Sequence, residues 1–381
     1  MKICLTVNSS PWSKFKGGGQ LAVHHLACAL SAKGHKVHVI YSKYLHEQFE
    51  LDLPYHIHWV RHYDFAMVNL NIFSYSKALR TLAKKEKFDV IHGNAEEAYW
   101  AGKIARENNS AYVFTSHTPN IPNTSMLKGI TNPIRFLKSI NSYLLRESIL
   151  EGDLVVAYSQ FSRNLILQGL SDPSFNRLKI IPPGIENSWF DVERKLSIDP
   201  SLLFWGRLEE EKGLPELFLA LKKVSKKFKG IRLILVGEGN RLKEYKNLVN
   251  TLGLIEQVEF KGWLDAQEIQ NLTKKSHLGL FPSRIESFGL SVIEAMSAGL
   301  PVIAARGGAV PENIEDGVTG TLVPVNNSDA LAEAIIFALE NPQHTNTLAK
   351  NAKRVAQEKF SWDKSAESMV DLYTSILQKS H

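Results

Sequence analysis

The stretch Glu286-Ser-Phe-Gly-Leu-Ser-Val-Ile-Glu294-Ala-Met-Ser-Ala-Gly-Leu-Pro-Val-Ile-Ala304 organises the chain. The apolar run Leu278–Phe281 before it predicts a buried strand, and Gly289–Ala298 predicts a helix that Gly-Leu-Pro ends. A second strand then begins. Glu286 precedes a helix N-terminus, whose unpaired N–H groups and partial positive charge suit an anion such as a phosphate. The alternative is an unremarkable surface carboxylate followed by Glu294 on a helix face.

The alternation of buried strand and helix continues along the chain in two series. One series occupies residues 3–181, and the other begins at Leu202. The 381 residues exceed one ordinary core, and the mixed polarity of residues 185–200 predicts a linker. We therefore predict an α/β chain with two domains, at residues 1–185 and 198–360. Ligands of such sheets bind at the carboxyl ends of the strands, so tandem sheets imply an interdomain cleft.

The charge of the chain is uneven. The formal net charge is +6, and residues 1–180 hold 21 Lys and Arg against 13 Asp and Glu. The basic excess therefore belongs to the first half, where it fits an anionic partner or a membrane surface as well as an ordinary basic surface. The hydrophobic fraction of 44% and the charged fraction of 22% are globular values, which argue against extensive disorder.

The two cysteines, Cys4 and Cys28, fall on the first strand and the first helix, and we interpret both as small buried apolar residues. Neither a disulfide framework nor zinc-type spacing is present in the sequence, which indicates a reducing compartment. The N-terminal apolar stretch is too short for a signal peptide, and no apolar run reaches the length of a membrane span. The expected location is the cytoplasm.

Gly17, Gly18 and Gly19 lie between the first strand and the first helix. Glycine lets a backbone approach a ligand closely, and the helix start offers N–H donors. A tight structural turn is the alternative. The pattern is not Gly-x-Gly-x-x-Gly, and no acidic residue ends the second strand, which disfavours a nicotinamide enzyme.

Two further loops follow predicted strands and carry candidate side chains. His117 follows the strand Ala111–Thr115. Arg207 and Lys212 follow the strand Leu202–Trp205, in a loop that begins at Gly206. A guanidinium and an ammonium on one loop can bind a diphosphate, although a solvated charged loop is an equal alternative.

The sequence lacks an Asp-x-Asp motif, the usual acidic clamp for a metal-bound diphosphate. Basic side chains and helix ends would have to neutralise a diphosphate instead. We therefore expect no metal and no cofactor.

Taken in order, these motifs closely resemble the family 4 glycosyltransferases, retaining enzymes that use nucleotide sugars. The resemblance runs from Met1 to the region of Trp362, and the most specific part is Glu286-Ser-Phe-Gly-Leu with Glu294 eight positions on. It implies the GT-B fold: two facing Rossmann-like domains with a deep cleft, and a C-terminal helix at about 361–381 that crosses back to the N-terminal domain. Domain one would bind the acceptor, and domain two the nucleotide sugar.

The resemblance also implies roles for individual residues. Glu286 would accept hydrogen bonds from sugar hydroxyls, and Glu294 from the ribose. Arg207 and Lys212 would bind the diphosphate, and His117 would face the sugar and the acceptor. The backbone and loop groups implied in donor binding are Gly17, Gly18, Gly19, Gly206, Trp263 near the base, Phe288, Gly289 and Leu290.

The implied reaction is hexosyl transfer from a nucleotide-diphosphate sugar, with uridine diphosphate sugars the commonest donors. The acceptor would be a hydroxyl of a glycan, a lipid or a small molecule, and no nucleic-acid partner is expected. The alternatives are a nucleotide-sugar epimerase or phosphorylase of the same fold, and a non-catalytic partner protein. Epimerases of this fold lack the pair Glu286 and Glu294, and phosphorylases are much longer.

A predicted amphipathic helix over Pro133–Leu150 carries the basic residues Arg135, Lys138 and Arg146. Its other side is apolar, a combination that permits peripheral docking on an anionic membrane. The alternative is an ordinary packed helix beside the cleft. This helix extends the expected location to the inner face of a membrane.

Overall fold

The computed structural model describes residues 1–13, 18–63, 71–117, 133–172 and 175–378, with the side chains of residues 133–139 excepted. The chain divides into two compact units. Unit 1 comprises Met1–Gly184 and Trp362–His381, and unit 2 comprises Ile185–Ser361. The stretch 185–200, expected to be a linker, therefore belongs to unit 2.

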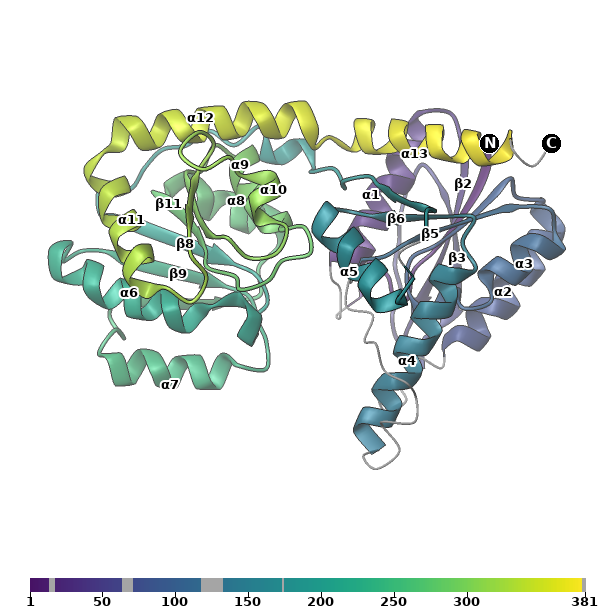
Figure 1. Cartoon of the computed structure of the whole chain (residues 1–381), viewed down its shortest axis with the longest axis horizontal. Helices are drawn as coiled ribbons and strands as arrows, with labels where there is room; N and C mark the ends of the chain where they lie inside the picture. Colours follow the sequence, from purple (N-terminus) through teal and green to yellow (C-terminus); the bar gives the residue numbers. More distant parts are fainter. Residues whose placement is uncertain (14–17, 64–70, 118–132, 173–174, 379–381) are drawn as a thin grey trace. The chain divides into compact units, whose positions relative to one another are not determined.

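Unit 1 is built on a seven-stranded parallel sheet in the order β3-β2-β1-β4-β5-β6-β7 (Figure 1). Its strands are β1 Lys2–Thr6, β2 Lys36–Lys43, β3 His56–Arg61, β4 Val90–Gly93, β5 Ala111–Thr115, β6 Leu154–Ala157 and β7 Leu178–Ile180. Its helices are α1 Gly18–Ala32, α2 Asn71–Glu86, the short 3-10 helix η1 Glu96–Ala98, α3 Ala101–Glu107, α4 Pro133–Leu150, α5 Gln160–Leu170 and α13 Trp362–Leu377.

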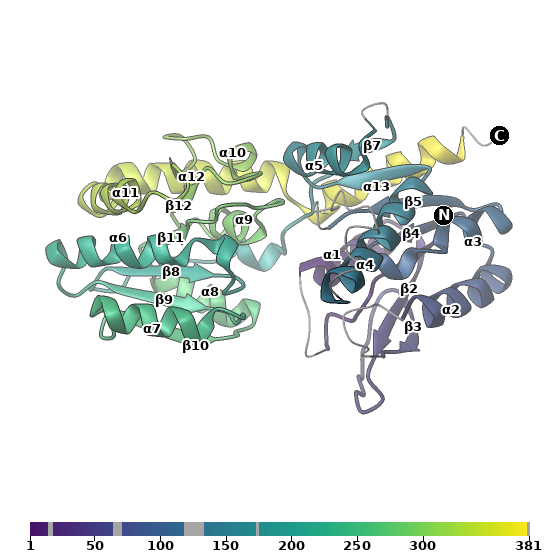
Figure 2. The same cartoon turned by 60° about the horizontal axis from the view of Figure 1, so that its bottom comes forward.

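Unit 2 repeats this architecture with six parallel strands in the order β10-β9-β8-β11-β12-β13 (Figure 2). Its strands are β8 Ser201–Trp205, β9 Arg232–Val236, β10 Val258–Gly262, β11 Leu278–Phe281, β12 Val302–Ala305 and β13 Thr321–Val323. Its helices are η3 Asn187–Trp189, η4 Glu210–Lys212, α6 Leu214–Lys227, α7 Leu242–Leu252, α8 Ala266–Lys275, α9 Leu290–Ser297, α10 Val310–Asn313, α11 Ser328–Glu340 and α12 Pro342–Lys359.

Both strand orders are those of doubly wound sheets, in which successive strands are added first on one side of the unit's first strand and then on its other side. The central strands are buried along their length, as parallel strands covered on both faces must be. The prediction of two Rossmann-like α/β halves is therefore confirmed.

The C-terminal helix α13 packs against α1 of unit 1. Ala366, Met369 and Tyr373 of α13 share a hydrophobic core with Val23 and Leu30 of α1. The Tyr373 hydroxyl also lies 2.6 Å from Nδ1 of the buried His92 at the end of β4. Helix α13 therefore contributes to the core of the first unit.

Two local predictions were wrong. Cys4 is fully buried, but Cys28 is only half-buried, with its Sγ 4.0 Å from Nδ1 of His24. The helix expected near Ala95–Asn108 is interrupted between η1 and α3. The short η1 is a separate turn of 3-10 helix before α3, and it places Glu97 inside the core.

Glu97 is a carboxyl group buried in the core of unit 1. Its Oε1 accepts a hydrogen bond of 3.1 Å from Thr6, while Oε2 has no hydrogen-bond partner among the described residues. Burial, reinforced by the charge of Glu96, raises the pKa of Glu97 to about 8. The folded protein therefore holds this group as the neutral acid at neutral pH.

The first prediction concerns the pH dependence of stability. Between its ordinary pKa near 4.5 and about 8, Glu97 is protonated in the folded chain and ionised in the unfolded chain, so its contribution to stability falls as the pH rises. Glu97→Gln removes this titration. We expect the melting temperature of Glu97→Gln minus that of wild type to increase from pH 5 to pH 8 and then level off. Glu50→Gln, at an exposed position of unit 1, is the control, and its melting temperature should differ from that of wild type by the same amount at every pH. A difference for Glu97→Gln that is equally constant with pH would contradict the assignment.

The second prediction uses two glycines with left-handed backbones. Gly213 (φ +65°) would place a Cβ 2.1 Å from the Pro282 carbonyl oxygen, whereas Gly253 (φ +72°) has open space around its Cβ position. Alanine at Gly253 costs only the left-handed conformation, about 1–2 kcal/mol. Gly213→Ala also forces two loops apart, which adds about 1–3 kcal/mol. Thermal unfolding should show the larger loss for Gly213→Ala, and equal losses would refute the contact.

Candidate functional site

The loops that follow β8 and β11 in unit 2 meet in a mostly buried ion pair. Lys212 Nζ lies 2.6 Å from Glu286 Oε1, and the two side chains are 14% and 12% exposed. Lys212 ends η4 after β8, and Glu286 follows the turn after β11. Since β8 and β11 are adjacent parallel strands, their carboxyl ends bring two distant parts of the sequence together.

Backbone contacts lock the same two loops together. The Arg284 N–H donates to the Glu211 carbonyl at 2.7 Å, and the Arg284 guanidinium donates to Glu216 Oε1 at 2.7 Å. Gly213 packs against the Pro282 carbonyl. The position of the Lys212–Glu286 pair is therefore determined by the backbone as well as by the pair's own attraction.

Arg207 lies on the same loop but outside the pair. Its side chain is 73% exposed and forms a 2.9 Å ion pair with Glu211. Gly206 begins the loop with an N–H that donates to the Val236 carbonyl at 3.0 Å. An exposed pair of this kind contributes little stability, so the guanidinium is available to an incoming anion.

The residues expected to supply backbone donors lie at the start of α9. Gly289 has φ +86° and precedes the first helical residue, Leu290. The Phe288 ring is buried and packs edge-on against Phe360, with centroids 5.6 Å apart. Asn313 Nδ2 donates to the Phe288 carbonyl at 2.5 Å. The Phe288 side chain therefore anchors the loop in the core, and only its backbone could meet a ligand.

Glu294 faces the end of β8 from the second turn of α9. Its Oε2 accepts a 2.7 Å hydrogen bond from the indole Nε1 of Trp205, the last residue of β8. Burial raises the pKa of Glu294 to about 7; the charge of Glu186 acts in the same direction, and the Trp205 hydrogen bond opposes both. The carboxylate is thus poised between its two protonation states at neutral pH.

Trp263, expected near a nucleotide base, follows β10 and is 52% exposed. Gly262 before it has φ +69°, which turns the chain at the end of the strand. The position is consistent with an aromatic surface at the carboxyl edge of the sheet.

His117 occupies the corresponding edge of unit 1. Its Nε2 lies 3.0 Å from Oδ1 of Asn94, and its Nδ1 lies 3.0 Å from the hydroxyl of Tyr158. Asn94 follows β4 and Tyr158 follows β6, the two neighbours of β5, after which His117 lies. Burial lowers the pKa of His117 to about 4, so the ring is neutral at physiological pH.

The hydrogen bonds of Asn94 assign the tautomer of His117. Asn94 Nδ2 donates to the carbonyls of Thr6 and His92 at 3.0 and 3.3 Å, which leaves Oδ1 as the atom that faces His117. His117 Nε2 therefore carries the proton, and Nδ1 accepts from the Tyr158 hydroxyl. Both ring nitrogens are engaged, so the ring is held in one orientation.

The predicted glycine turn lies beside His117. A Cβ on Gly19 would be 3.3 Å from the His117 ring, so the absence of a side chain lets the start of α1 approach the imidazole. Gly18 is exposed at the first position of α1, and Gly17 lies outside the described residues. Two sequence motifs almost a hundred residues apart are thus neighbours.

The sequence interpretation assigned no role to Trp205, Asn94 or Tyr158. Each residue ends or follows a strand, which is the signal that would have found it. A strand end predicts location, whereas the partner of a side chain depends on which strands are adjacent.

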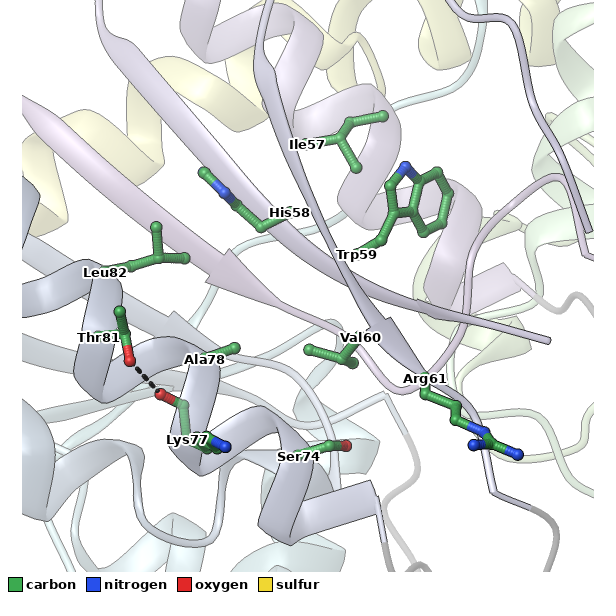
Figure 3. A pocket seen from close by; sticks show the side chains of 10 residues that line it. All are labelled: Ile57, His58, Trp59, Val60, Arg61, Ser74, Lys77, Ala78, Thr81 and Leu82. Carbon is green, nitrogen blue, oxygen red and sulfur yellow. Dashed lines mark hydrogen bonds between the residues drawn. The ribbon is translucent and has the colours of Figure 1, made fainter. Parts of the chain in front are cut away.

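A separate cavity of about 550 Å³ lies between the edge strand β3 and helix α2 (Figure 3). Its lining includes Val60, Ala78 and Leu82, together with the charged Arg61 and Lys77. None of the predicted site residues lines it. This cavity is therefore distinct from the strand-end loops of unit 1 on which His117 lies.

The described part of the chain holds no group of three or more His, Cys, Asp or Glu side chains placed to bind a metal ion. Within the same residues, no helix combines the length and the apolar character needed to cross a membrane.

Comparison with known proteins agrees with this geometry. Residues 16–189 match the family described as Glycosyltransferase Family 4, and residues 186–355 match Glycosyl transferases group 1. An uncharacterized glycosyltransferase of Methanocaldococcus jannaschii is 27% identical, over 94% of this chain and 95% of that protein.

Solved structures show the same fold. Sucrose-phosphate synthase from Thermosynechococcus elongatus superposes with a TM-score of 0.81 at 23% identity, covering 99% of both chains. Anabaena HepE in complex with UDP-glucose gives a TM-score of 0.74 at 21% identity, covering 98% of this chain and all of that one. Together, the two family matches and the paired parallel sheets show that this chain belongs to the family 4 glycosyltransferases and has the GT-B fold.

Proposed function

We propose that this glycosyltransferase moves a hexosyl group from a uridine diphosphate sugar to a hydroxyl acceptor, with retention of the anomeric configuration and without a metal ion. The Lys212–Glu286 pair carries this proposal. It places a desolvated ammonium and a carboxylate side by side at the carboxyl edge of a Rossmann-like sheet, close in the chain to the start of α9. A nucleotide sugar requires both groups, one for its phosphates and one for its hydroxyls.

Donor binding would redistribute the contacts of this pair. The sugar hydroxyls donate to Glu286, and Lys212 turns its N–H donors toward the diphosphate. The exposed Arg207 exchanges Glu211 for the same diphosphate, to which its planar guanidinium can donate two parallel hydrogen bonds. The N-terminus of α9 adds its unpaired backbone N–H groups. These positive groups would replace a metal ion in neutralising the phosphates.

The chemical step breaks the bond between the anomeric carbon and the diphosphate oxygen, and the electron pair leaves with the diphosphate. Lys212 and Arg207 stabilise this developing charge. The acceptor oxygen forms the new bond on the same face of the sugar, and its proton passes to the departing phosphate oxygen. Retention is the stereochemistry expected from the family to which the chain belongs. Glu286 acts by binding hydroxyls and has no acid–base role in this scheme.

The uracil-containing donor is proposed because a protein of the same fold, Anabaena HepE, has been solved with UDP-glucose. The acceptor would bind unit 1, where His117 is held as a neutral ring. A glycan, a lipid or a small molecule could supply the hydroxyl.

The third prediction tests the roles of the charged residues. Lys212→Met and Glu286→Gln should each lower the rate of UDP release from saturating UDP-glucose about 10²–10³-fold, because each removes a group aimed at the donor. Arg207→Met should act in the same direction. Lys226→Met, at an exposed position of α6, is the control and should retain the wild-type rate.

Water serves as the acceptor in this assay, so the natural acceptor is not needed. Near-wild-type rates for Arg207→Met, Lys212→Met and Glu286→Gln together would reject the site. If the protein releases ADP from ADP-glucose or GDP from GDP-mannose but no UDP from UDP-glucose, only the uridine donor is rejected.

The fourth prediction concerns peripheral membrane contact through α4. Its basic residue Arg146 is 42% exposed at the side chain, whereas the side chains of Arg135 and Lys138 lie outside the described residues. If the helix docks on anionic lipid, the full chain should float with vesicles that contain phosphatidylglycerol at low salt and be released at high salt. The absence of flotation at low salt would remove the membrane proposal and leave the transferase proposal intact.

A further inference from the structure

The indole of Trp205 is clamped at the end of β8. It stacks on Trp189 with centroids 5.9 Å apart and an interplanar angle of 8°, and it meets the Phe281 ring edge-on at 4.9 Å and 82°. Only 4% of the residue is exposed. Its position is therefore set by two aromatic neighbours, one from η3 and one from the end of β11.

The clamped indole points its N–H at a carboxylate. Nε1 donates to Glu294 Oε2 at 2.7 Å, and among the described residues this is the one hydrogen bond that the Glu294 carboxylate receives. A hydrogen bond to a charged group contributes more than one between neutral groups. The bond occupies one oxygen from the direction of the sheet and leaves the acceptor capacity of the other oxygen to a ligand.

We infer that Trp205 is a positioning residue that orients Glu294 to recognise a ribose, so that the protein discriminates ribonucleotides from deoxyribonucleotides. This inference rests on the proposed function, in which a nucleoside diphosphate sugar binds unit 2. A ribose hydroxyl donates to a carboxylate oxygen, and a deoxyribose that lacks the hydroxyl leaves that oxygen without a partner. Sites built to bind a hydroxyl reject ligands without it for this reason.

The position of Trp205 in the chain strengthens the inference. The next residue, Gly206, begins the loop that holds Arg207 and Lys212. The aromatic clamp on Trp205 thus fixes the start of the diphosphate loop and the orientation of Glu294 at the same time. Ribose recognition and diphosphate recognition would share one rigid strand end.

The inference is tested by measuring, by calorimetry, how tightly the full chain binds UDP, 2′-deoxy-UDP and 3′-deoxy-UDP. Wild type should bind UDP at least about tenfold more tightly than one of the deoxy analogues, the size of a lost hydrogen bond to a charged group. Trp205→Phe keeps an aromatic ring but removes the N–H, and it should shrink this ratio at least about threefold. Trp100→Phe, which removes the indole N–H of a partly buried tryptophan in unit 1, is the control and should keep the wild-type ratio.

A double-mutant cycle shows whether Trp205 acts through Glu294. In Glu294→Gln the ratio should be small, and adding Trp205→Phe should change it no further. If Trp205→Phe leaves the ratio unchanged, the inference is overturned. Equal weakening of all three ligands would then indicate a purely structural role for Trp205. If Trp205→Phe does not fold, the benzothiophene analogue of tryptophan at position 205 preserves the ring shape without the N–H and takes its place.

The two proposals fail in different ways. If wild type binds none of UDP, ADP and GDP, the nucleotide-sugar function itself is wrong. If ADP or GDP binds in place of UDP, its own 2′-deoxy and 3′-deoxy analogues replace the uridine series. If a nucleotide binds but the deoxy analogues bind equally well, the donor site stands and the role of Trp205 is wrong.

Discussion

The ion pair between Lys212 and Glu286 is the central electrostatic interaction at the carboxyl edge of the sheet in unit 2. Removing two charges from water is costly, and their mutual attraction repays this cost only when geometry and further hydrogen bonds are favourable. Here the loops after β8 and β11 are already joined by the Arg284 backbone and by the close approach of Gly213 to Pro282. The pair therefore does not need to assemble the loops. It holds each charge at a defined place.

In unit 1, two titratable groups are held by hydrogen bonds to uncharged partners instead of by ion pairs. His117 is neutral and held by Asn94 and Tyr158, while Glu97 is held by Thr6. Burial shifts both pKa values toward the uncharged form, downward for the histidine and upward for the carboxyl. Hydrogen bonds between neutral groups then satisfy most of the buried polar atoms. His117 and Glu97 are therefore both uncharged at neutral pH.

In unit 2, aromatic packing positions a polar contact between the sheet and helix α9. Trp205 extends from the sheet to Glu294 on α9, and its ring is fixed between Trp189 and Phe281. A tryptophan at a strand end is usually interpreted as core. In this protein the apolar faces of the ring pack in the core and its N–H meets Glu294 of the proposed donor site, which combines the packing and polar roles that the indole allows.

The sequence by itself determined the two Rossmann-like halves, the strand-end loops and most of the candidate residues, because hydrophobic periodicity and glycine-rich turns act over short stretches of chain. It also placed Glu286, Lys212 and His117 in loops at the functional edge of their sheets. It could not reveal that Lys212 pairs with Glu286, that Trp205 holds Glu294, or that Asn94 and Tyr158 hold His117. Those contacts join residues between 23 and 89 positions apart. Only the tertiary structure decided them, because the order of strands in each sheet determines which loops become neighbours, and that order is a property of the whole fold.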